Sequence, residues 1–192
     1  YTATYRNGQL DGREQAFDDS GKILRLDTLW DKGKKQGLDA RYYPNGKPER
    51  LAVIDQGRLL THLREYYEDG QLLNDIHRCT FKEDGSTRDD VCEYHHMYYP
   101  DGKPQYYYAF QYGQRQEGYS NYPDGKRKDE LLVDRAADTS VFNAYYPGGQ
   151  LKCTEPRSGH STRTVNGETM ISYASADRDG DNICYHPNGK VA

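Results

Sequence analysis

A short turn motif recurs seven times along this chain of 192 residues and constrains its fold more than any other feature. Each copy places one or two aromatic residues before a tight turn that ends in Gly and then Lys or Gln, as in YYPNGK at 42–47. Such self-similarity at a fixed period is the signature of a repeat protein. The motif glycines are spaced about 24 residues apart, with two longer gaps, and are Gly21, Gly46, Gly70, Gly102, Gly125, Gly149 and Gly189.

The chemistry of these turns indicates antiparallel strands on either side. In PNG at 44–46, Pro presets the backbone for a type I turn, Asn is tolerated next, and Gly supplies the left-handed residue that follows. A weaker turn precedes several of the motifs by about a dozen residues, at Gly8, Gly33, Gly57 and Gly113. Two turns in each repeat leave room for strands of about six residues and for no helix.

We therefore predict an all-β protein of a single domain, an elongated, twisted antiparallel sheet of consecutive β-hairpin repeats. Residues 1–150 form the array, with a hairpin inserted around 75–96, and residues 151–192 form an elaborated hairpin lobe and the last repeat of the same continuous domain. The segment 126–140 lacks the second-turn Gly, and such an irregularity is a place to look for partner contact. The chain holds 19 Tyr, and because disordered chains are poor in aromatic residues, this composition indicates order.

These turns, with the weaker Gly-x-x-x-Gly pattern between them, resemble MORN repeats over about 1–150 and again over 183–190. The bacterial variant of the repeat, found in antitoxin or immunity components of toxin systems, is the nearest type. The resemblance implies a β-repeat fold and a non-catalytic role in binding another protein. Repeat sheets of this kind serve many binding tasks, so the resemblance predicts the fold more strongly than it predicts the function.

The four cysteines bracket the two longer gaps between repeats. Cys79 and Cys92 enclose the first insertion, and Cys153 and Cys184 enclose the second. Of the three pairings that four cysteines permit, this placement favours Cys79–Cys92 and Cys153–Cys184. Four reduced cysteines in a cytosolic chain are the alternative; disulfides would instead indicate the periplasm or the outside of the cell.

Two metal sites are weaker alternatives. A zinc site could use His77, Cys79 and Cys92 with His95 or His96, although the usual Cys-x-x-Cys spacing is absent. The sequence DRDGDN at 177–182 places Asp177, Asp179 and Asp181 at alternate positions, as calcium loops do, but its Gly comes too early for an EF-hand. We expect no cofactor.

Tyrosine is the strongest functional signal, because its amphipathic ring is enriched in protein recognition surfaces. Packing between repeats is the alternative role for these rings. The partner-binding candidates are Tyr43, Tyr67, Tyr99, Tyr106, Tyr108 and Tyr146.

Other functional classes are disfavoured. The net charge of −4 argues against nucleic acid, and no apolar run approaches the roughly 18 residues of a membrane helix. Ser158, His160 and Ser161 lie close together, but no nucleophile elbow accompanies them and the acidic residues are dispersed, so we expect no enzyme.

The expected function is that of an immunity-like or antitoxin-like protein, which binds a secreted toxin and sterically neutralises it. A structural or adhesive repeat scaffold of the cell envelope is the alternative. We expect the periplasm or cell envelope of a bacterium, with any signal or lipid anchor lying before Tyr1.

Overall fold

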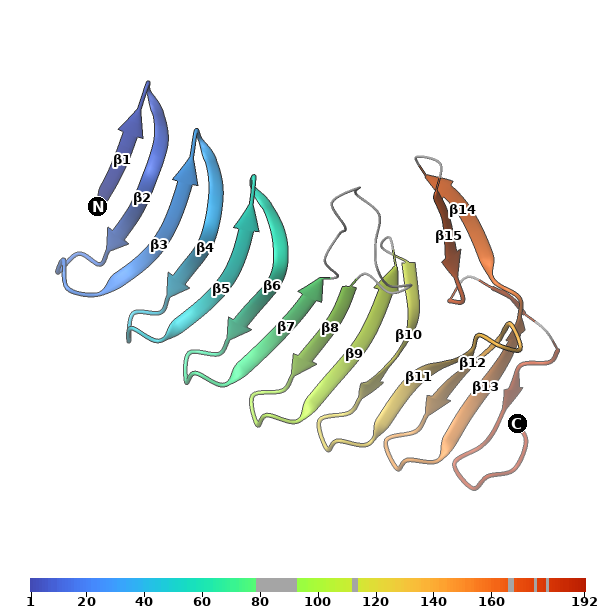
Figure 1. Ribbon diagram of the computed structural model, residues 1–192. Coiled ribbons are helices and arrows are strands. Elements are labelled where there is room, and N and C mark those ends of the chain that lie inside the picture. Colours follow the sequence, from blue (N-terminus) through green and yellow to red (C-terminus); the bar gives the residue numbers. More distant parts are fainter. Residues whose placement is uncertain (79–92, 112–113, 166–167, 175, 179) are drawn as a thin grey trace. The chain divides into compact units, whose positions relative to one another are not determined.

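The structure of the chain is a computed structural model that describes residues 1–78, 93–111, 114–165, 168–174, 176–178 and 180–192. The described residues form 17 strands and no helix, so the predicted all-β fold of consecutive antiparallel hairpins is confirmed (Figure 1). The chain divides into two compact units. Unit 1 contains Tyr1–Thr80 with Pro100–Gly102, and unit 2 contains Phe81–Tyr99 with Lys103–Ala192.

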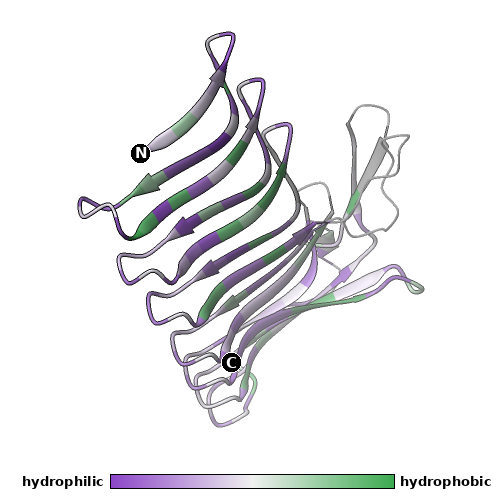
Figure 2. Cartoon of the chain, turned by 60° about the vertical axis from the view of Figure 1, so that its left-hand side comes forward, coloured by the Kyte–Doolittle hydropathy of each residue, from purple (hydrophilic) through white to green (hydrophobic). Residues whose placement is uncertain are grey.

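Unit 1 is a sheet of seven strands in which each strand pairs antiparallel with the next one along the chain. Hydrophobic and hydrophilic bands alternate along several of these strands near the N-terminus (Figure 2). The strands are β1 (Thr2–Arg6), β2 (Gln9–Phe17), β3 (Leu24–Asp31), β4 (Lys34–Tyr42), β5 (Pro48–Asp55), β6 (Arg58–Tyr66) and β7 (Leu72–Arg78).

The motif turns have the geometry that their residues predict. Between β4 and β5, the amide of Gly46 donates to the carbonyl of Tyr43 at 2.9 Å, and Gly46 has a φ of 80°. The side-chain oxygen of Asn45 accepts a hydrogen bond from the backbone amide of Lys47, and this bond stabilises the turn from within. The strand register then slips by one residue between Arg41 and Tyr42, as expected for a type I turn followed by a left-handed glycine.

The weaker turns are of a different type. In unit 1 they consist of two residues with positive φ, and the second residue is Gly in each. Lys32 and Gly33, for example, have φ of 48° and 79°. This is the type I′ geometry, whose twist matches that of the flanking strands. Each repeat therefore alternates a five-residue turn with a compact two-residue turn. The hairpins closed by the two-residue turns also have a register slip, which lies farther from the turn, for example between Thr28 and Trp30.

Unit 2 continues the hairpin pattern and adds a lobe. Strands β8 to β13 pair antiparallel in chain order, β16 and β17 both pair with β13, and β14 pairs only with β15. The strands are β8 (Glu93–Tyr98), β9 (Pro104–Gln111), β10 (Gln114–Asn121), β11 (Arg127–Asp134), β12 (Thr139–Tyr145), β13 (Leu151–Ser158), β14 (Ser161–Val165), β15 (Glu168–Ser172), β16 (Asp177–Arg178) and β17 (Ile183–Cys184).

The β14–β15 hairpin packs against the strands of unit 2 through polar contacts. The side-chain amide of Gln116 in β10 donates to the carbonyl of Ile171 in β15, and the hydroxyl of Ser140 donates to the carbonyl of Tyr173 at 3.5 Å. Gln116 and Ser140 are both almost fully buried. The predicted turn of this lobe, Asn166-Gly167, lies outside the described residues.

A disulfide joins Cys153 in β13 to Cys184 in β17, as the spacing of the cysteines predicts. The two residues stand directly opposite each other in the register of these strands. The other predicted pair, Cys79–Cys92, lies outside the described residues, as does the tip of the hairpin expected around 75–96.

Among the residues that the structure describes, few apolar side chains are fully buried in either unit. In unit 1 the buried apolar residues are Ala40, Ala52 and Ile54, and in unit 2 they are Ala109, Leu131 and Tyr173. Most described tyrosines are half-buried, because a sheet without a second layer cannot enclose a large ring on all sides.

A buried carboxylate organises the polar interior of unit 1. Asp39 in β4 has a side chain only 3% exposed, and it accepts hydrogen bonds from Thr28 at 2.7 Å and Lys35 at 2.8 Å. Arg50 in β5 donates to its second oxygen at 2.6 Å. Burial raises the pKa of Asp39, but the hydrogen bonds from Lys35, Thr28 and Arg50 outweigh it and hold the pKa below its usual value.

Candidate functional site

A ladder of tyrosine hydroxyls ties successive motif turns together. The ring that follows each strand donates its hydroxyl to the backbone carbonyl just before the equivalent position of the next repeat. This bond joins Tyr43 to the carbonyl of Tyr66 at 2.7 Å in unit 1. In unit 2 the same bond joins Tyr99 to Asn121, Tyr122 to Tyr145 and Tyr146 to Tyr185, at 2.8 to 3.0 Å.

Four of the six tyrosines named as partner-binding candidates occupy this turn position. Tyr43, Tyr99 and Tyr146 use their hydroxyls between repeats, and Tyr67 holds the equivalent place after β6. A ring fixed in this way still offers an edge to solvent, since Tyr43 and Tyr99 are half-buried. The ladder gives these residues a structural role whether or not a partner also touches them.

The other two candidates, Tyr106 and Tyr108, stack on each other in β9 with ring centroids 4.8 Å apart. The guanidinium of Arg115 lies over the Tyr108 ring at 4.1 Å, and burial lowers the pKa of Arg115. Side chains alternate along a strand, so these rings and Tyr107 point to opposite sides of the sheet. Tyr106 and Tyr108 therefore do not share a surface with Tyr107.

The most distinctive surface of unit 2 is a row of side chains that crosses six strands. Each member stands directly opposite its neighbours in the strand register. We call it the cross-strand row, and its members from β8 to β13 are His96, Tyr107, Tyr119, Glu130, Asn143 and Thr154.

The first half of the cross-strand row is aromatic. The His96 and Tyr107 rings have centroids 4.8 Å apart, and those of Tyr107 and Tyr119 are 5.8 Å apart. The ring of Tyr94, two residues before His96, stacks on the Tyr107 ring, and the two ring centroids are 6.3 Å apart. The guanidinium of Arg127 lies 3.7 Å from the centre of the Tyr119 ring, in cation–π contact. Burial, together with the charge of Glu117, raises the pKa of Tyr107, so this phenol stays neutral.

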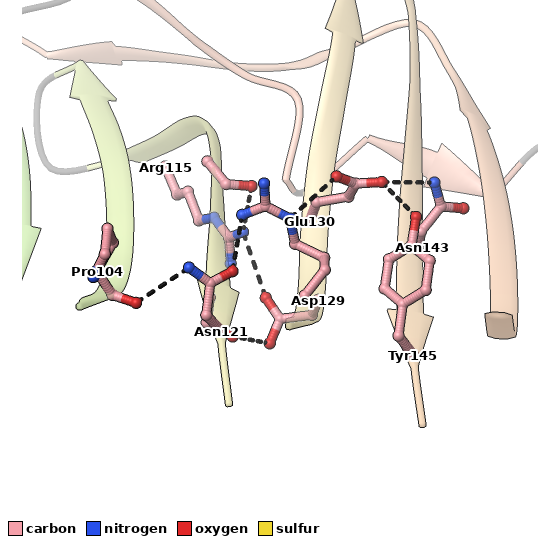
Figure 3. A network of polar contacts seen from close by, with 10 residues as sticks. Pro104, Arg115, Asn121, Asp129, Glu130, Asn143 and Tyr145 are labelled. Carbon is pink, nitrogen blue, oxygen red and sulfur yellow. Dashed lines mark hydrogen bonds and ion pairs between the residues drawn. The ribbon is translucent and has the colours of Figure 1, made fainter. Parts of the chain in front are cut away.

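The second half of the row is a hydrogen-bonded network around Glu130. Glu130 accepts from the Tyr145 hydroxyl at 2.5 Å and from the Asn143 amide at 3.2 Å (Figure 3). Thr154 donates in turn to Asn143 at 2.7 Å. Burial and the bond to Glu130 raise the pKa of Tyr145 to about 12, so its hydroxyl keeps the proton that it donates.

Arg127 joins the two halves of the row. Its guanidinium forms an ion pair with Glu130 at 3.5 Å and donates to the Asn121 side chain at 3.1 Å. Asn121 donates onward to the carbonyl of Pro104 at 3.0 Å. Arg127 is thus held by contacts on three sides, counting the Tyr119 ring, and it presents a fixed charge beside the aromatic rings.

A groove of about 320 Å³ runs along this surface. It is lined by Tyr107, Tyr119 and Glu130 of the row, with Glu117, Arg127 and Leu132 beside them. The side chain of Leu132 is 53% exposed, so an apolar contact point stands among charged and aromatic groups. This combination of aromatic rings, an exposed Leu and fixed charges suits the recognition of another protein.

A close approach of the backbone makes this surface possible. A side chain at Gly118 in β10 would overlap the carbonyl oxygen of Tyr107, and Gly118 has a φ of 141°, which other residues rarely adopt. Glycine at this position therefore lets β10 lie against β9 with Tyr107 and Tyr119 side by side.

The structure describes the metal-ligand candidates only in part. Cys79, Cys92 and Asp179, together with the side chain of Asp177, lie outside what it describes, and Asp181 is exposed. His95 contacts Glu93 and Phe110 and lies on the opposite side of β8 from His96. Among the described residues, no group of three or more His, Cys, Asp or Glu side chains could hold a metal ion.

The serine and histidine cluster near residue 160 forms a local contact. His160 Nδ1 lies 2.6 Å from an oxygen of Asp138, and its ring packs on Tyr173 at 5.8 Å. Ser161 donates to the carbonyl of Ser172 at 3.3 Å. These bonds anchor the start of β14 and the end of β15.

Sequence reasoning missed the members of the cross-strand row. Its members stand six residues before or five residues after a motif Gly, but the residue type at these two positions differs from repeat to repeat, whereas the motif tyrosines recur. Neither a scan against protein-family models nor a search of curated proteins finds a match for this chain.

Proposed function

We propose that this chain is a non-catalytic protein-binding repeat protein that acts through the cross-strand row and its groove. The observation that carries the proposal is the stacked surface of Tyr107, Tyr119 and Arg127 beside the exposed Leu132. Tyr and Arg are the residues most often found at the energetic centre of protein interfaces, and they lose little conformational freedom when already fixed.

The partner we propose is a secreted toxin, which the chain would neutralise sterically in the manner of an immunity protein or antitoxin. The resemblance of the motif turns to the bacterial variant of MORN repeats supports this choice. The groove carries both Arg127 and two carboxylates, Glu117 and Glu130, so it suits a partner surface of mixed charge with an apolar centre.

The compartment we propose is the periplasm or the cell envelope. The Cys153–Cys184 disulfide supports it, because disulfides persist in oxidising compartments. The described residues include no helix that could span a lipid bilayer.

Co-purification from the source cell with mass spectrometry, followed by binding measurements on the purified pair, tests the proposal. We expect one secreted protein to be recovered, and its toxic activity to fall in proportion to complex formed. Leu132→Asp, which places a carboxylate in the groove, should weaken the complex by about 30-fold or more, as loss of an interface centre does. Tyr119→Ala should act in the same direction.

The matched control is Leu38→Asp in β4 of unit 1. Leu38 is 46% exposed, close to the value for Leu132, and it lies outside the groove. We expect this variant to bind within about twofold of the wild type. Equal binding by all three variants would refute the assigned surface. Recovery of only further copies of the chain, or of envelope components, would instead favour the structural scaffold.

A further inference from the structure

Two histidines on neighbouring strands of unit 1 face each other at hydrogen-bonding distance. His62 in β6 stands directly opposite His77 in β7 in the antiparallel register. The Nε2 atom of His62 lies 2.7 Å from the Nδ1 atom of His77, and the ring centroids are 4.3 Å apart with an interplanar angle of 57°. His77 is exposed and His62 half-buried, so an ion from solvent can reach the pair.

The two facing nitrogens can both serve as metal ligands. At 2.7 Å only one of them can carry a hydrogen, since the other must accept it. A neutral imidazole can also move its hydrogen to the far nitrogen, here Nδ1 of His62 and Nε2 of His77. Each facing nitrogen then has a lone pair available for an ion, and the neutral imidazole is the form that binds metals.

The spacing of the nitrogens fits a metal with ligands at right angles. With metal–nitrogen bonds of about 2.0–2.1 Å, two ligands at 90° stand about 2.9 Å apart, and two at the tetrahedral angle about 3.3 Å apart. The pair at 2.7 Å needs to open by about 0.2 Å for the first geometry and by about 0.6 Å for the second. Square-planar or octahedral coordination by nitrogen and oxygen is typical of Cu²⁺ and Ni²⁺.

We propose that His62 and His77 form a surface chelate for a divalent transition-metal ion, with water completing the coordination. The pair is held in place because paired strands fix both backbones before the metal arrives, so little ordering is left to the binding step. This site differs from the zinc set expected from the sequence, which grouped His77 with Cys79 and Cys92. In the structure the partner of His77 across the sheet is His62.

Calorimetric titration of the full chain with CuCl₂, NiCl₂ or MgCl₂ tests the proposal. We expect saturable binding of one Cu²⁺ or Ni²⁺ per chain, tighter for Cu²⁺, and none of Mg²⁺, which prefers oxygen ligands. His62→Ala and His77→Ala should each weaken binding by at least about tenfold, since losing even an outer-shell partner costs that much. His186→Ala, which removes an exposed His of unit 2, is the matched control and should change binding by less than about twofold.

A second measurement locates the ion. Added Ni²⁺ or Cu²⁺ should broaden the backbone amide signals of β6 and β7 around residues 62 and 77 in nuclear magnetic resonance spectra. The proposal is overturned if no saturable binding occurs, if both single His variants bind as the wild type does, or if the broadening lies elsewhere. Far-ultraviolet circular dichroism shows that each variant is folded before these comparisons are made.

Discussion

Replacing Asp39 by Asn tests whether a single buried carboxylate holds the polar interior of unit 1 together. Asn keeps the size of the side chain, but the change removes the charge and replaces one of the two accepting oxygens by an NH2 group, which can only donate. In the wild type this charge faces Lys35 at 2.8 Å and Arg50 at 2.6 Å, whose side chains are 29% and 24% exposed. Asp39 itself is 3% exposed.

The expected loss follows from the kind of bond that is weakened. The two carboxylate oxygens have different donors, since Oδ1 accepts from Thr28 and Lys35 and Oδ2 accepts from Arg50. The single amide oxygen of Asn can replace only one of them, and its NH2 group then faces a donor at the other place. A cation bond that is kept as a bond to a neutral oxygen weakens by about 1 kcal/mol, and a lost bond to a charged group costs about 1.5–3 kcal/mol. We therefore expect Asp39→Asn to lower the free energy of unfolding by about 3 kcal/mol. With a urea dependence of about 1–3 kcal/mol per molar, the midpoint falls by about 1.5 M.

The single tryptophan provides the assay. Trp30 lies in β3, its indole donates to Glu14 at 2.8 Å, and Lys35 lies 5.7 Å from its ring. Since Trp30 is the only Trp of the chain, its fluorescence during urea titration reports on unit 1. This matters because a repeat array can unfold in parts and a global signal would mix them.

The control is Asp27→Asn in β3. Asp27 forms a two-pronged ion pair with Arg13, at 2.7 and 2.5 Å, but the Arg13 side chain is 59% exposed. Exposed pairs of this kind contribute about 0–1 kcal/mol. Equal midpoints for the two variants, or a loss below about 0.5 kcal/mol for Asp39→Asn, would refute the reasoning.

The contribution of Asp39 to the free energy of unfolding should depend on pH, and the direction of its pKa shift predicts how. The pKa of Asp39 is lowered in the folded chain, so its contribution to stability is present above the unfolded value of about 4 and is lost as the pH falls through the folded value. The gap in stability between wild type and Asp39→Asn should therefore close on acidification below about pH 4.

Four further outcomes are expected. Replacing Cys153 and Cys184 by Ser should lower the stability of unit 2 by about 3.5 kcal/mol, because the disulfide closes a loop with a sequence separation of 31. Native-state hydrogen exchange of the backbone amides of β12 and β13, which lie in unit 2, measures this loss. Tyr146→Phe should cost about 1 kcal/mol in the same assay, since it removes one hydroxyl bond to the carbonyl of Tyr185, and no loss would contradict the ladder. The Tyr145 phenol should titrate near pH 12 in nuclear magnetic resonance of isotope-labelled tyrosine, and unit 2 should lose stability as the pH rises from about 10 through that value. Glu130→Gln should bring this pKa down while burial, the larger cause, keeps it above the usual value.

The hairpins could be predicted from sequence because each motif turn is specified by residues that touch one another. Gly46 adopts a positive φ, Asn45 bonds to the amide of Lys47, and Tyr43 receives the turn hydrogen bond, all within five residues. Such signals need no knowledge of distant parts of the chain. The disulfide between Cys153 and Cys184 was predictable for a related reason, since both ends of one insertion must return to neighbouring strands.

The cross-strand row was not predictable, because a bulge sets its register. If β9 and β10 ran regularly from the pair Gln111 and Gln114, Tyr119 would stand opposite Tyr106. The register slips by one residue between Arg115 and Glu117, and Tyr119 instead meets Tyr107. Such a slip moves a whole set of side chains relative to its neighbours, and nothing in the run of three tyrosines at 106–108 announces it.

In the segment 126–140 the sequence is irregular but the structure is regular. Its sequence lacks the second-turn Gly, yet β11 and β12 form a regular hairpin through it. Asp138 takes the left-handed position with a φ of 53°, and Asp134 accepts from the amides of Ala136 and Ala137. Asp tolerates the left-handed conformation better than most residues, so the turn survives without glycine.

The ladder tyrosines and the strand-face tyrosines make contacts of different kinds. Ladder tyrosines such as Tyr122 and Tyr146 bond to backbone carbonyls, which every repeat has, so their contacts do not depend on strand side chains. Strand-face positions are consequently free to differ: the residue six places before the motif Gly is Ala40 in unit 1, but it is Tyr119 in β10. The ladder bonds do not decide which residue stands at this position, but burial does in unit 1, where Ala40 is fully enclosed. In unit 2 the same position holds the half-buried Tyr119 ring, which lies against the guanidinium of Arg127. If the proposed function holds, Tyr119→Ala weakens partner binding while every ladder bond stays in place.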